Sequence, residues 1–362
     1  MDWRLPLTPD EVTAEWLERA LSGRYPGIGI ERLTVTDILW GTGTKMMVSV
    51  AYNEVGRAAG IPDRLCIKAG LAEHRAAMKF IYQTEARFFA DLAPQLSMGL
   101  PRVLFAAADD EQGVVVMEDL RTVDADICRV QRPLTGEQAA AFLDDLAALH
   151  ARWWNSPALA EEGALGWLLR HDPLPDAAWG DFGRGKLEPD NWEHAMGLPR
   201  ALAVPGLCRD RQRVHAALQA LRRHDPDGPL CVIHGDAHLG NMYISADGQP
   251  GFLDWQTARR GHWAQDVAYF YISALDPLDR RACERDLVAG YLAALTRHGV
   301  PDAPDEATAW EAIRAHIIYG LFYWLVNPVE WQAEENNAAV APRFAWAAVD
   351  HDAPPVGPLS PA

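Results

Sequence analysis

Two short polar segments, each directly after an apolar strand, constrain this chain of 362 residues more than any other feature of its sequence. The first is His234-Gly-Asp-Ala-His-Leu-Gly-Asn241, which follows the apolar stretch Leu230–Ile233. The second is Phe252-Leu-Asp-Trp-Gln256, in which Phe252–Asp254 is expected to be a short strand, and a turn at Asp247-Gly248 lies between the two segments. Either segment alone is a weak signal. Together, each after a strand and separated by one hairpin, they form a specific pattern that surface turns rarely produce.

The polar residues of these segments match the parts that phosphoryl transfer needs. Asp236 and Asn241 have the Asp-x-x-x-x-Asn spacing of a kinase catalytic loop. In such a loop the Asp faces the incoming hydroxyl, while the Asn turns its amide oxygen toward a metal ion. Mg²⁺ takes few protein oxygens and keeps phosphate oxygens and water as its other ligands. We therefore predict Asp236 as the catalytic base, and Asn241 and Asp254 as ligands of Mg²⁺.

A lysine in an apolar strand predicts the phosphate contact. Lys68 ends the apolar run Leu65-Cys-Ile-Lys68, so its ammonium needs an acidic partner. We expect it to contact the phosphates of ATP while a glutamate of the following helix, predicted over Ala72–Ala93, holds it. Glu73 and Glu85 both fall on that helix. The alternative is an edge lysine that reaches out to solvent.

Two backbone segments are candidates for the rest of a nucleotide site. Trp40-Gly-Thr-Gly-Thr-Lys45 joins the first two predicted strands, and Gly41 and Gly43 would let backbone N–H groups approach phosphates closely. A glycine-containing hairpin turn is the alternative. The backbone near Glu118 and Leu120, after the strand Gly113–Glu118, is expected to meet adenine, from its position.

The order of elements predicts an α+β fold with a small β-rich lobe and a larger helical lobe. A capping box at Thr8 and Glu11 predicts an N-terminal helix. Strands are expected over 31–38, 46–53, 64–69, 102–108 and 113–118, with one helix between the third and fourth. Beyond Arg121 the chain reads mainly as helices, one of them opened by a capping box at Thr135-Gly-Glu-Gln138. We predict an N-lobe over residues 1–118 and a C-lobe over 119–362.

These motifs resemble the aminoglycoside phosphotransferase and choline kinase superfamily. Its HGDxHxxN segment is matched by His234, Gly235, Asp236, His238 and Asn241, and Leu253-Asp-Trp-Gln256 resembles the DFQ of the ecdysteroid-kinase-like branch. The resemblance extends over most of the chain, and it is weakest over 156–209 and beyond Leu275. It implies a two-lobed protein-kinase-like fold, an ATP- and Mg²⁺-dependent transferase, and a small-molecule hydroxyl acceptor.

The resemblance also implies roles for further residues. It favours Glu85 over Glu73 as the partner of Lys68, and it supports adenine contacts at Glu118 and Leu120. His234 is expected to orient the catalytic loop; His238 is expected to do the same, with a role close to the phosphate as the alternative. Asp266 is expected to cap its helix and to hydrogen-bond that loop.

Three other functions are weighed against this one. A protein kinase is disfavoured, because no long activation segment and no Ala-Pro-Glu follow Asp254, and Trp-Gln replaces Phe-Gly. A non-catalytic nucleotide-binding module would be expected to lose Asp236, Asn241, Asp254 or Lys68. An antibiotic phosphotransferase, of aminoglycoside or macrolide type, remains an alternative.

The acceptor stays open at this level. A cationic acceptor would want a cluster of carboxylates, for which Asp172, Asp176, Asp181, Glu188 and Asp190 are candidates, although they could equally be solvated charges. Tryptophans in the second half favour a less polar alcohol or phenol. The six considered are Trp153, Trp154, Trp179, Trp192, Trp263 and Trp324.

Composition limits the partners and the compartment. The formal net charge of −17 disfavours a nucleic-acid partner, since contacts to phosphates dominate such binding. Five scattered cysteines suggest neither a disulfide framework nor a zinc site. No signal peptide is visible, and the most apolar run, Ile317–Val326, is about half of a membrane span. We expect a cytoplasmic protein with no membrane partner, and leave its oligomeric state open.

Overall fold

The computed structural model describes residues 4–173, 180–224 and 228–357, and its contacts divide the chain into two compact units. The first comprises Met1–Asp126 and Tyr243–Thr257, and the second comprises Ile127–Met242 and Ala258–Ala362. The segment with Asp254 therefore groups with the N-terminal part of the chain. The lobe boundary predicted at Glu118 stays a prediction.

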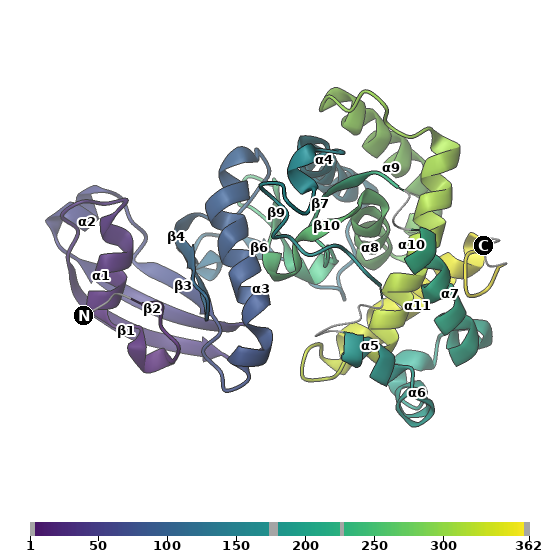
Figure 1. The fold of residues 1–362 in the computed structure, drawn as a ribbon, viewed down its shortest axis with the longest axis horizontal. Helices are drawn as coiled ribbons and strands as arrows, with labels where there is room; N and C mark the ends of the chain where they lie inside the picture. The colour runs from purple at the N-terminus through teal and green to yellow at the C-terminus, as the bar shows by residue number, and fades with distance from the viewer. Residues whose placement is uncertain (1–3, 174–179, 225–227, 358–362) are drawn as a thin grey trace. The chain divides into compact units, whose positions relative to one another are not determined.

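The first unit is built on a five-stranded antiparallel sheet (Figure 1). The strands are β1 Ile30–Leu39, β2 Thr44–Tyr52, β3 Arg64–Ala69, β4 Val103–Ala108 and β5 Gly113–Glu118. They lie in the order β1-β2-β3-β5-β4. The predicted strands are thus all present, with bounds that differ by two residues at most.

The two faces of this sheet differ in character. Alternate residues of β2 and β3, such as Met46, Val48 and Ile67, join a hydrophobic core with helix α1 (Ala14–Ser22). Successive side chains of a strand point to opposite faces. Residues of the other parity, among them Lys45 and Lys68, therefore lie on the face away from this core.

Helix α3 (Arg75–Arg87) packs against β4 and β5 and carries the buried residues Tyr82 and Glu85. It begins three residues later than predicted and continues as a π-helical turn over Phe88–Leu92. Glu73 therefore lies outside the helix and is exposed. The one further helix of this unit is the short α2 (Glu54–Ala58), as far as the described residues go.

The N-terminal capping box predicted at Thr8 is wrong. Residues Pro9–Glu11 form only a 3-10 turn, and the Thr8 side chain makes no capping bond. Glu11 instead accepts the Leu7 amide at 2.7 Å and pairs with Arg4. The helix begins after Thr13, whose hydroxyl accepts the amide of Trp16 at 3.1 Å. The predicted capping box does not form because Thr13 caps the helix instead, and because Glu11 is bonded to Leu7 and Arg4.

The second unit is mainly helical, which together with the sheet confirms the predicted α+β fold. Its helices are α4 Gly136–Arg152, α5 Gly180–Lys186, α6 Pro189–Met196, α7 Arg211–His224, α8 Trp263–Ala274, α9 Pro277–Arg297, α10 Glu306–Val326 and α11 Glu334–Asp350. The capping box at Thr135 and Gln138 is confirmed. No helix among the described residues has both the length and the apolar character needed to cross a bilayer.

Short strands position the two polar segments. In the second unit β7 (Leu230–Ile233) pairs antiparallel with β10 (Arg259–His262), and the catalytic-loop candidate follows β7. The other short strands are β6 Asp126–Ile127, β8 Met242–Ile244 and β9 Pro250–Phe252. The strand predicted over Phe252–Asp254 ends at Phe252, so Asp254 lies in the loop beyond it.

Candidate active site

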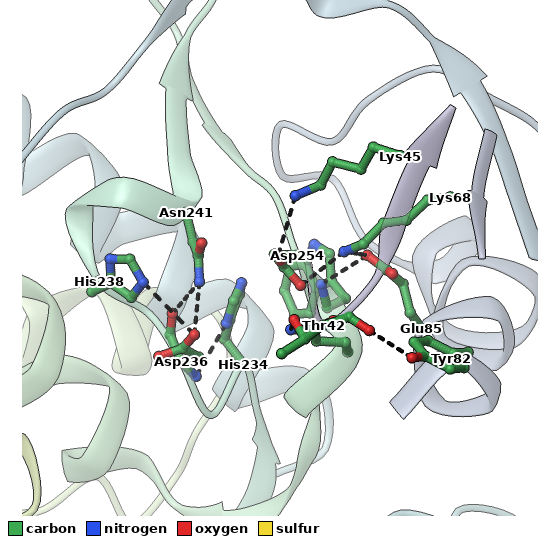
Figure 2. A network of polar contacts seen from close by, with 12 residues as sticks. Thr42, Lys45, Lys68, Tyr82, Glu85, His234, Asp236, His238, Asn241 and Asp254 are labelled. Carbon is green, nitrogen blue, oxygen red and sulfur yellow. Dashed lines mark hydrogen bonds and ion pairs between the residues drawn. The ribbon is translucent and has the colours of Figure 1, made fainter. Parts of the chain in front are cut away.

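The first unit holds a buried cluster of charges around Lys68. Its Nζ lies 2.9 Å from Glu85 Oε1 and 2.8 Å from Asp254 Oδ1 (Figure 2). Burial alone would lower the pKa of Lys68, but the two carboxylates raise that pKa above its ordinary value. The ammonium therefore stays charged although its side chain is only 4% exposed. Of the two glutamates considered, Glu85 is the one beside Lys68.

Asp254 is held in an unusual backbone conformation. Its φ is 63°, in the left-handed region that residues other than glycine rarely adopt. The next amide, of Trp255, donates to Glu85 Oε1 at 3.2 Å, and the Trp255 ring stacks on Phe88 at a centroid distance of 3.8 Å. Surrounding contacts thus fix the strained residue, a combination that clusters at functional sites. The Asp254 side chain remains 19% exposed.

The glycine-containing loop bends over this cluster. A Cβ added to Gly43 would lie 3.2 Å from Lys68 Cε, so a larger residue there would have to displace the lysine side chain by a few tenths of an ångström. Gly41 lies in the same bend, where a Cβ would have more room. Between them, the Thr42 carbonyl accepts the Tyr82 hydroxyl at 2.5 Å, and Gln256 Nε2 donates to Thr42 Oγ1 at 3.4 Å.

Lys45 is a charged residue of this cluster that the sequence analysis did not single out. It pairs directly with Lys68 across β2 and β3, and its Nζ lies 4.0 Å from Asp254 Oδ2. Both lysines therefore approach the same carboxylate (Figure 2). Only the strand register reveals this neighbour, since Lys45 and Lys68 are far apart in the sequence.

The segment expected to meet adenine is anchored by its backbone. Glu118 ends β5, and its amide donates to the Arg102 carbonyl at 3.0 Å. Leu120 begins a short 3-10 turn, in which the Asp119 carboxylate accepts bonds from Arg121. Burial opposes the ionisation of Asp119, but the bonds from Arg121 hold its pKa below the ordinary value.

In the second unit, Asp236 and Asn241 contact each other directly. Asn241 Nδ2 donates to the Asp236 carbonyl and to Asp236 Oδ2, both at 3.0 Å (Figure 2). Because the amide nitrogen faces Asp236, the amide oxygen of Asn241 points away from that carboxylate. These two bonds therefore fix Asp236 and Asn241 relative to each other within the loop.

The two histidines of this segment act on the loop backbone. His234 Nδ1 accepts the amide of Asp236 at 3.3 Å, and His238 Nδ1 accepts the amide of Gly240 at 3.0 Å. An accepting Nδ1 places the proton of a neutral ring on Nε2. For His238, that nitrogen lies 3.7 Å from Asp236 Oδ2.

Asp266 ties the turn before Asp236 to helix α8. Its carboxylate accepts the amides of His234 at 2.6 Å and Gly235 at 2.9 Å. Gly235 has a φ of 81°, so a glycine is required in this turn. The expectation that Asp266 caps its helix is wrong, because the cap of α8 is the His262 side chain, which accepts the Ala264 amide.

Two further residues support Asp266 from distant helices. His150 Nε2 lies 3.3 Å from Asp266 Oδ2, and His150 Nδ1 lies 2.7 Å from the Tyr291 hydroxyl. Burial acts to raise the pKa of Asp266, but His150 and the Gly235 amide outweigh burial and hold it below the ordinary value. Through its contact with Asp266, His150 therefore also supports the loop.

Several aromatic side chains of the second unit lie near Asp236. The Tyr269 hydroxyl donates a hydrogen bond to the Asp236 carboxylate, and burial, with Asp236, raises the pKa of Tyr269 well above its ordinary value. The ring centroids of His238 and Trp324 are 5.1 Å apart, and those of Tyr269 and Tyr319 are 5.6 Å apart. Tyr269 was missed, although it follows Asp266 by one helical turn and so lies on the same side of α8.

The tryptophans considered from the sequence are mostly core residues. Trp153, Trp192, Trp263 and Trp324 are buried, and Trp154 is half-buried. Trp179 lies outside the described residues. Among these side chains, Trp324 is the one whose ring contacts the catalytic-loop candidate, through His238.

The donors present fit a magnesium ion. Asp254 in the first unit has a partly exposed carboxylate, and Asn241 in the second unit has an amide oxygen; taken by itself, each is an oxygen ligand of the kind that Mg²⁺ prefers. Within the described residues, no three side chains of His, Cys, Asp or Glu gather as a metal site.

Comparison with known proteins gives a family and several relatives. The sequence model of the phosphotransferase enzyme family matches residues 75–310. A homoserine kinase of Brucella anthropi is 31% identical over 137 residues, which are 37% of this chain. The match spans only 41% of the length of that relative.

Two solved structures resemble the chain over most of its length. A macrolide 2'-phosphotransferase type I has a TM-score of 0.48 at 20% identity, covering 92% of this chain and 98% of that one. A choline kinase of Streptococcus pneumoniae has a TM-score of 0.49 at 10% identity, with the same coverage of both chains.

Proposed function

The chain belongs to the phosphotransferase enzyme family, and from this premise we propose that it moves the γ-phosphoryl group of ATP to a hydroxyl of a small molecule. The observation that carries the proposal is the pairing of Asp236 with Asn241 directly after β7. The catalytic loop of a kinase combines an Asp that meets the acceptor hydroxyl with an Asn that can hold a metal ion.

The roles that we propose follow from the contacts of each residue. Lys68, held by Glu85, binds phosphate oxygens, while Gly41 and Gly43 cover them, and the backbone at Glu118 and Leu120 binds adenine. Asp254 and Asn241 would hold Mg²⁺, which when bound neutralises charge on the phosphates. His234, His238 and Asp266 keep the loop in shape through the bonds described above.

We assign the chemical step to Asp236. Its carboxylate accepts the hydrogen bond of the acceptor hydroxyl and aligns that oxygen with the γ-phosphorus. As the new P–O bond forms, the bond from the γ-phosphorus to the bridging oxygen breaks, ADP leaves, and the hydroxyl proton passes to Asp236. Asn241 and Tyr269 both bond Asp236, and so fix the direction in which the carboxylate points.

For the acceptor we propose an apolar or aromatic alcohol. Tyr269 bonds Asp236, His238 Nε2 lies 3.7 Å from Asp236 Oδ2, and the rings of Tyr269 and Trp324 both pack against His238. The acidic cluster considered for a cationic acceptor has less support, since Asp172 pairs with Arg222 at 2.9 Å and Glu188 and Asp190 are exposed residues at the start of α6. Asp176 and the side chain of Asp181 lie outside the described residues.

Within the family we propose the ecdysteroid-kinase-like branch, from the Asp-Trp-Gln segment. Gln256 of that segment also contacts the glycine-containing loop, because its side-chain amide donates to the Thr42 hydroxyl.

A substrate screen tests the function. Purified protein is incubated with MgATP and a panel of alcohols, phenols, amino alcohols, aminoglycosides and macrolides, and mass spectrometry detects compounds that gain one phosphate. Asp236→Asn should lower transfer by about 10²- to 10⁴-fold, the usual worth of a general base. The matched control is Asp247→Asn, in an exposed turn, which should leave transfer unchanged.

Three outcomes would redirect the proposal. Transfer near the wild-type rate in Asp236→Asn would remove that residue from the mechanism. Phosphorylation of an aminoglycoside or macrolide alone would replace the proposed acceptor class. Tight nucleotide binding with neither transfer nor ATP hydrolysis above the level of Asp236→Asn would indicate a non-catalytic module.

A further inference from the structure

Lys45 lies at a position where its positive charge would destabilise the sheet if no negative charge were near. The register of β2 and β3 sets it directly opposite Lys68, on the same face of the sheet. Like charges directly opposite on neighbouring strands destabilise a sheet. Here the cost is offset by Asp254, whose two carboxylate oxygens lie 2.8 Å from Lys68 Nζ and 4.0 Å from Lys45 Nζ.

The two lysines are not equivalent. The side chain of Lys68 is 4% exposed, and it keeps Glu85 as an acidic partner even when Asp254 binds another cation. The side chain of Lys45 is 42% exposed, and its ion pair is with Asp254. Lys45 also follows the glycine-containing loop, two residues after Gly43, whose backbone approaches Lys68.

A divalent cation on Asp254 would change this balance. Its charge would occupy the carboxylate that now offsets both lysines, and the positive charges of the cluster would outnumber the two carboxylates. An anionic ligand with several charged oxygens restores the balance, since lysine ammonium groups are effective point-charge partners of phosphate. A polyphosphate chain is such a ligand, whereas a single phosphate offers fewer oxygens.

We propose that Lys45 is a second phosphate-binding cation, which acts with Lys68 on the polyphosphate of a nucleoside triphosphate and so selects triphosphate over monophosphate. This inference rests on the proposed function, because it needs nucleotide binding at the first unit. In the nucleotide-free protein Lys45 neutralises Asp254, and in the bound protein it neutralises phosphate.

Binding calorimetry tests the inference without relying on turnover. ATP, ADP and AMP are titrated into wild type, Lys45→Met and Lys45→Arg, each with Mg²⁺ present. Loss of one charge-assisted contact should weaken ATP binding by about 10- to 100-fold in Lys45→Met. AMP affinity should change by less than about twofold, because a single phosphate offers fewer charged oxygens for a second ammonium group. Lys45→Arg should recover most of the ATP affinity.

The control is Lys79→Met, which removes an exposed lysine of α3 that bonds only the Asp110 carbonyl among the described residues. It should bind all three nucleotides as wild type does. An unchanged ratio of ATP to AMP affinity in Lys45→Met, with a changed melting temperature of the free protein, would show a purely structural role and overturn the inference. Failure of wild type to bind any of the nucleotides would overturn the proposed function itself.

Discussion

A single carboxylate, Asp266, shows how much of this site depends on residues that touch no substrate. It is fully buried, yet it accepts two backbone amides of the turn before Asp236 and a bond from His150. The sequence supplied Asp266 through its resemblance to a family pattern. His150 and Tyr291 could not be assigned in that way, because their link to Asp266 joins helices that are distant in the chain.

We predict that Asp266→Asn destabilises the protein in a pH-dependent way. The pKa of Asp266 is held below its ordinary value in the folded state, so its carboxylate stabilises the fold at pH values above about 3.9, the ordinary pKa of the unfolded state. That stabilisation is lost as the pH falls through the lowered pKa. In Asp266→Asn an NH2 group replaces one of the two oxygens that accept the His234 and Gly235 amides, so the variant should lose about 2 kcal/mol or more of unfolding free energy at pH 7.

Urea unfolding at pH 7 and near pH 3 measures this difference. The free-energy gap between wild type and Asp266→Asn should shrink at the lower pH, because Asp266 of the unfolded chain, with its ordinary pKa of about 3.9, takes up a proton there. Asp302→Asn, in the exposed turn between α9 and α10, should show a gap of less than about 0.5 kcal/mol at either pH. A gap that stays constant between the two pH values would contradict the assigned role of the charge.

At the scale of single elements, local sequence signals were good guides to strands and poorer guides to helix ends. Strands β3 and β5 have the predicted bounds, because apolar runs bounded by turn residues mark them clearly. These local signals do not predict the register in which two strands pair. The pairing of Lys45 with Lys68 depends on how β2 aligns with β3, and no pattern within either strand encodes that alignment.

The start of α1 gives a prediction about two threonines that look alike in sequence. Thr13 accepts the Trp16 amide, whereas Thr8 makes no capping bond. Thr13→Ala should therefore lower the free energy of unfolding by about 1 kcal/mol, the usual worth of an N-cap. Thr8→Ala should lower it by less than about 0.5 kcal/mol, as at an ordinary surface site. Equal losses in chemical denaturation, or a larger loss for Thr8→Ala, would reassign the cap.

At the scale of the whole molecule, the sequence predicted the α+β fold from the order of its elements, with strands first and helices after. It did not predict that the chain would return to the first unit over Tyr243–Thr257. That return is a tertiary event, which contacts of Glu85 and Phe88 with Trp255 stabilise. It places Asp254 among the lysines of the sheet, while Asp236 belongs to the second unit.

This assignment of residues to units gives a prediction about ligand-dependent stability. A ligand at a hundredfold excess over its dissociation constant adds about 2.7 kcal/mol to the folded state, so millimolar MgATP should raise the melting temperature by several degrees. The rise should vanish in Lys68→Met, because that residue carries the phosphate contact proposed for the first unit. It should persist in Asp236→Asn, whose side chain is proposed to face the acceptor, and in the surface control Lys79→Met. Differential scanning fluorimetry with and without MgATP gives all four values in one experiment. If Lys68→Met keeps the wild-type rise, the nucleotide does not bind at the lysine cluster; if Asp236→Asn loses it, that residue belongs to the nucleotide site and not to the acceptor site.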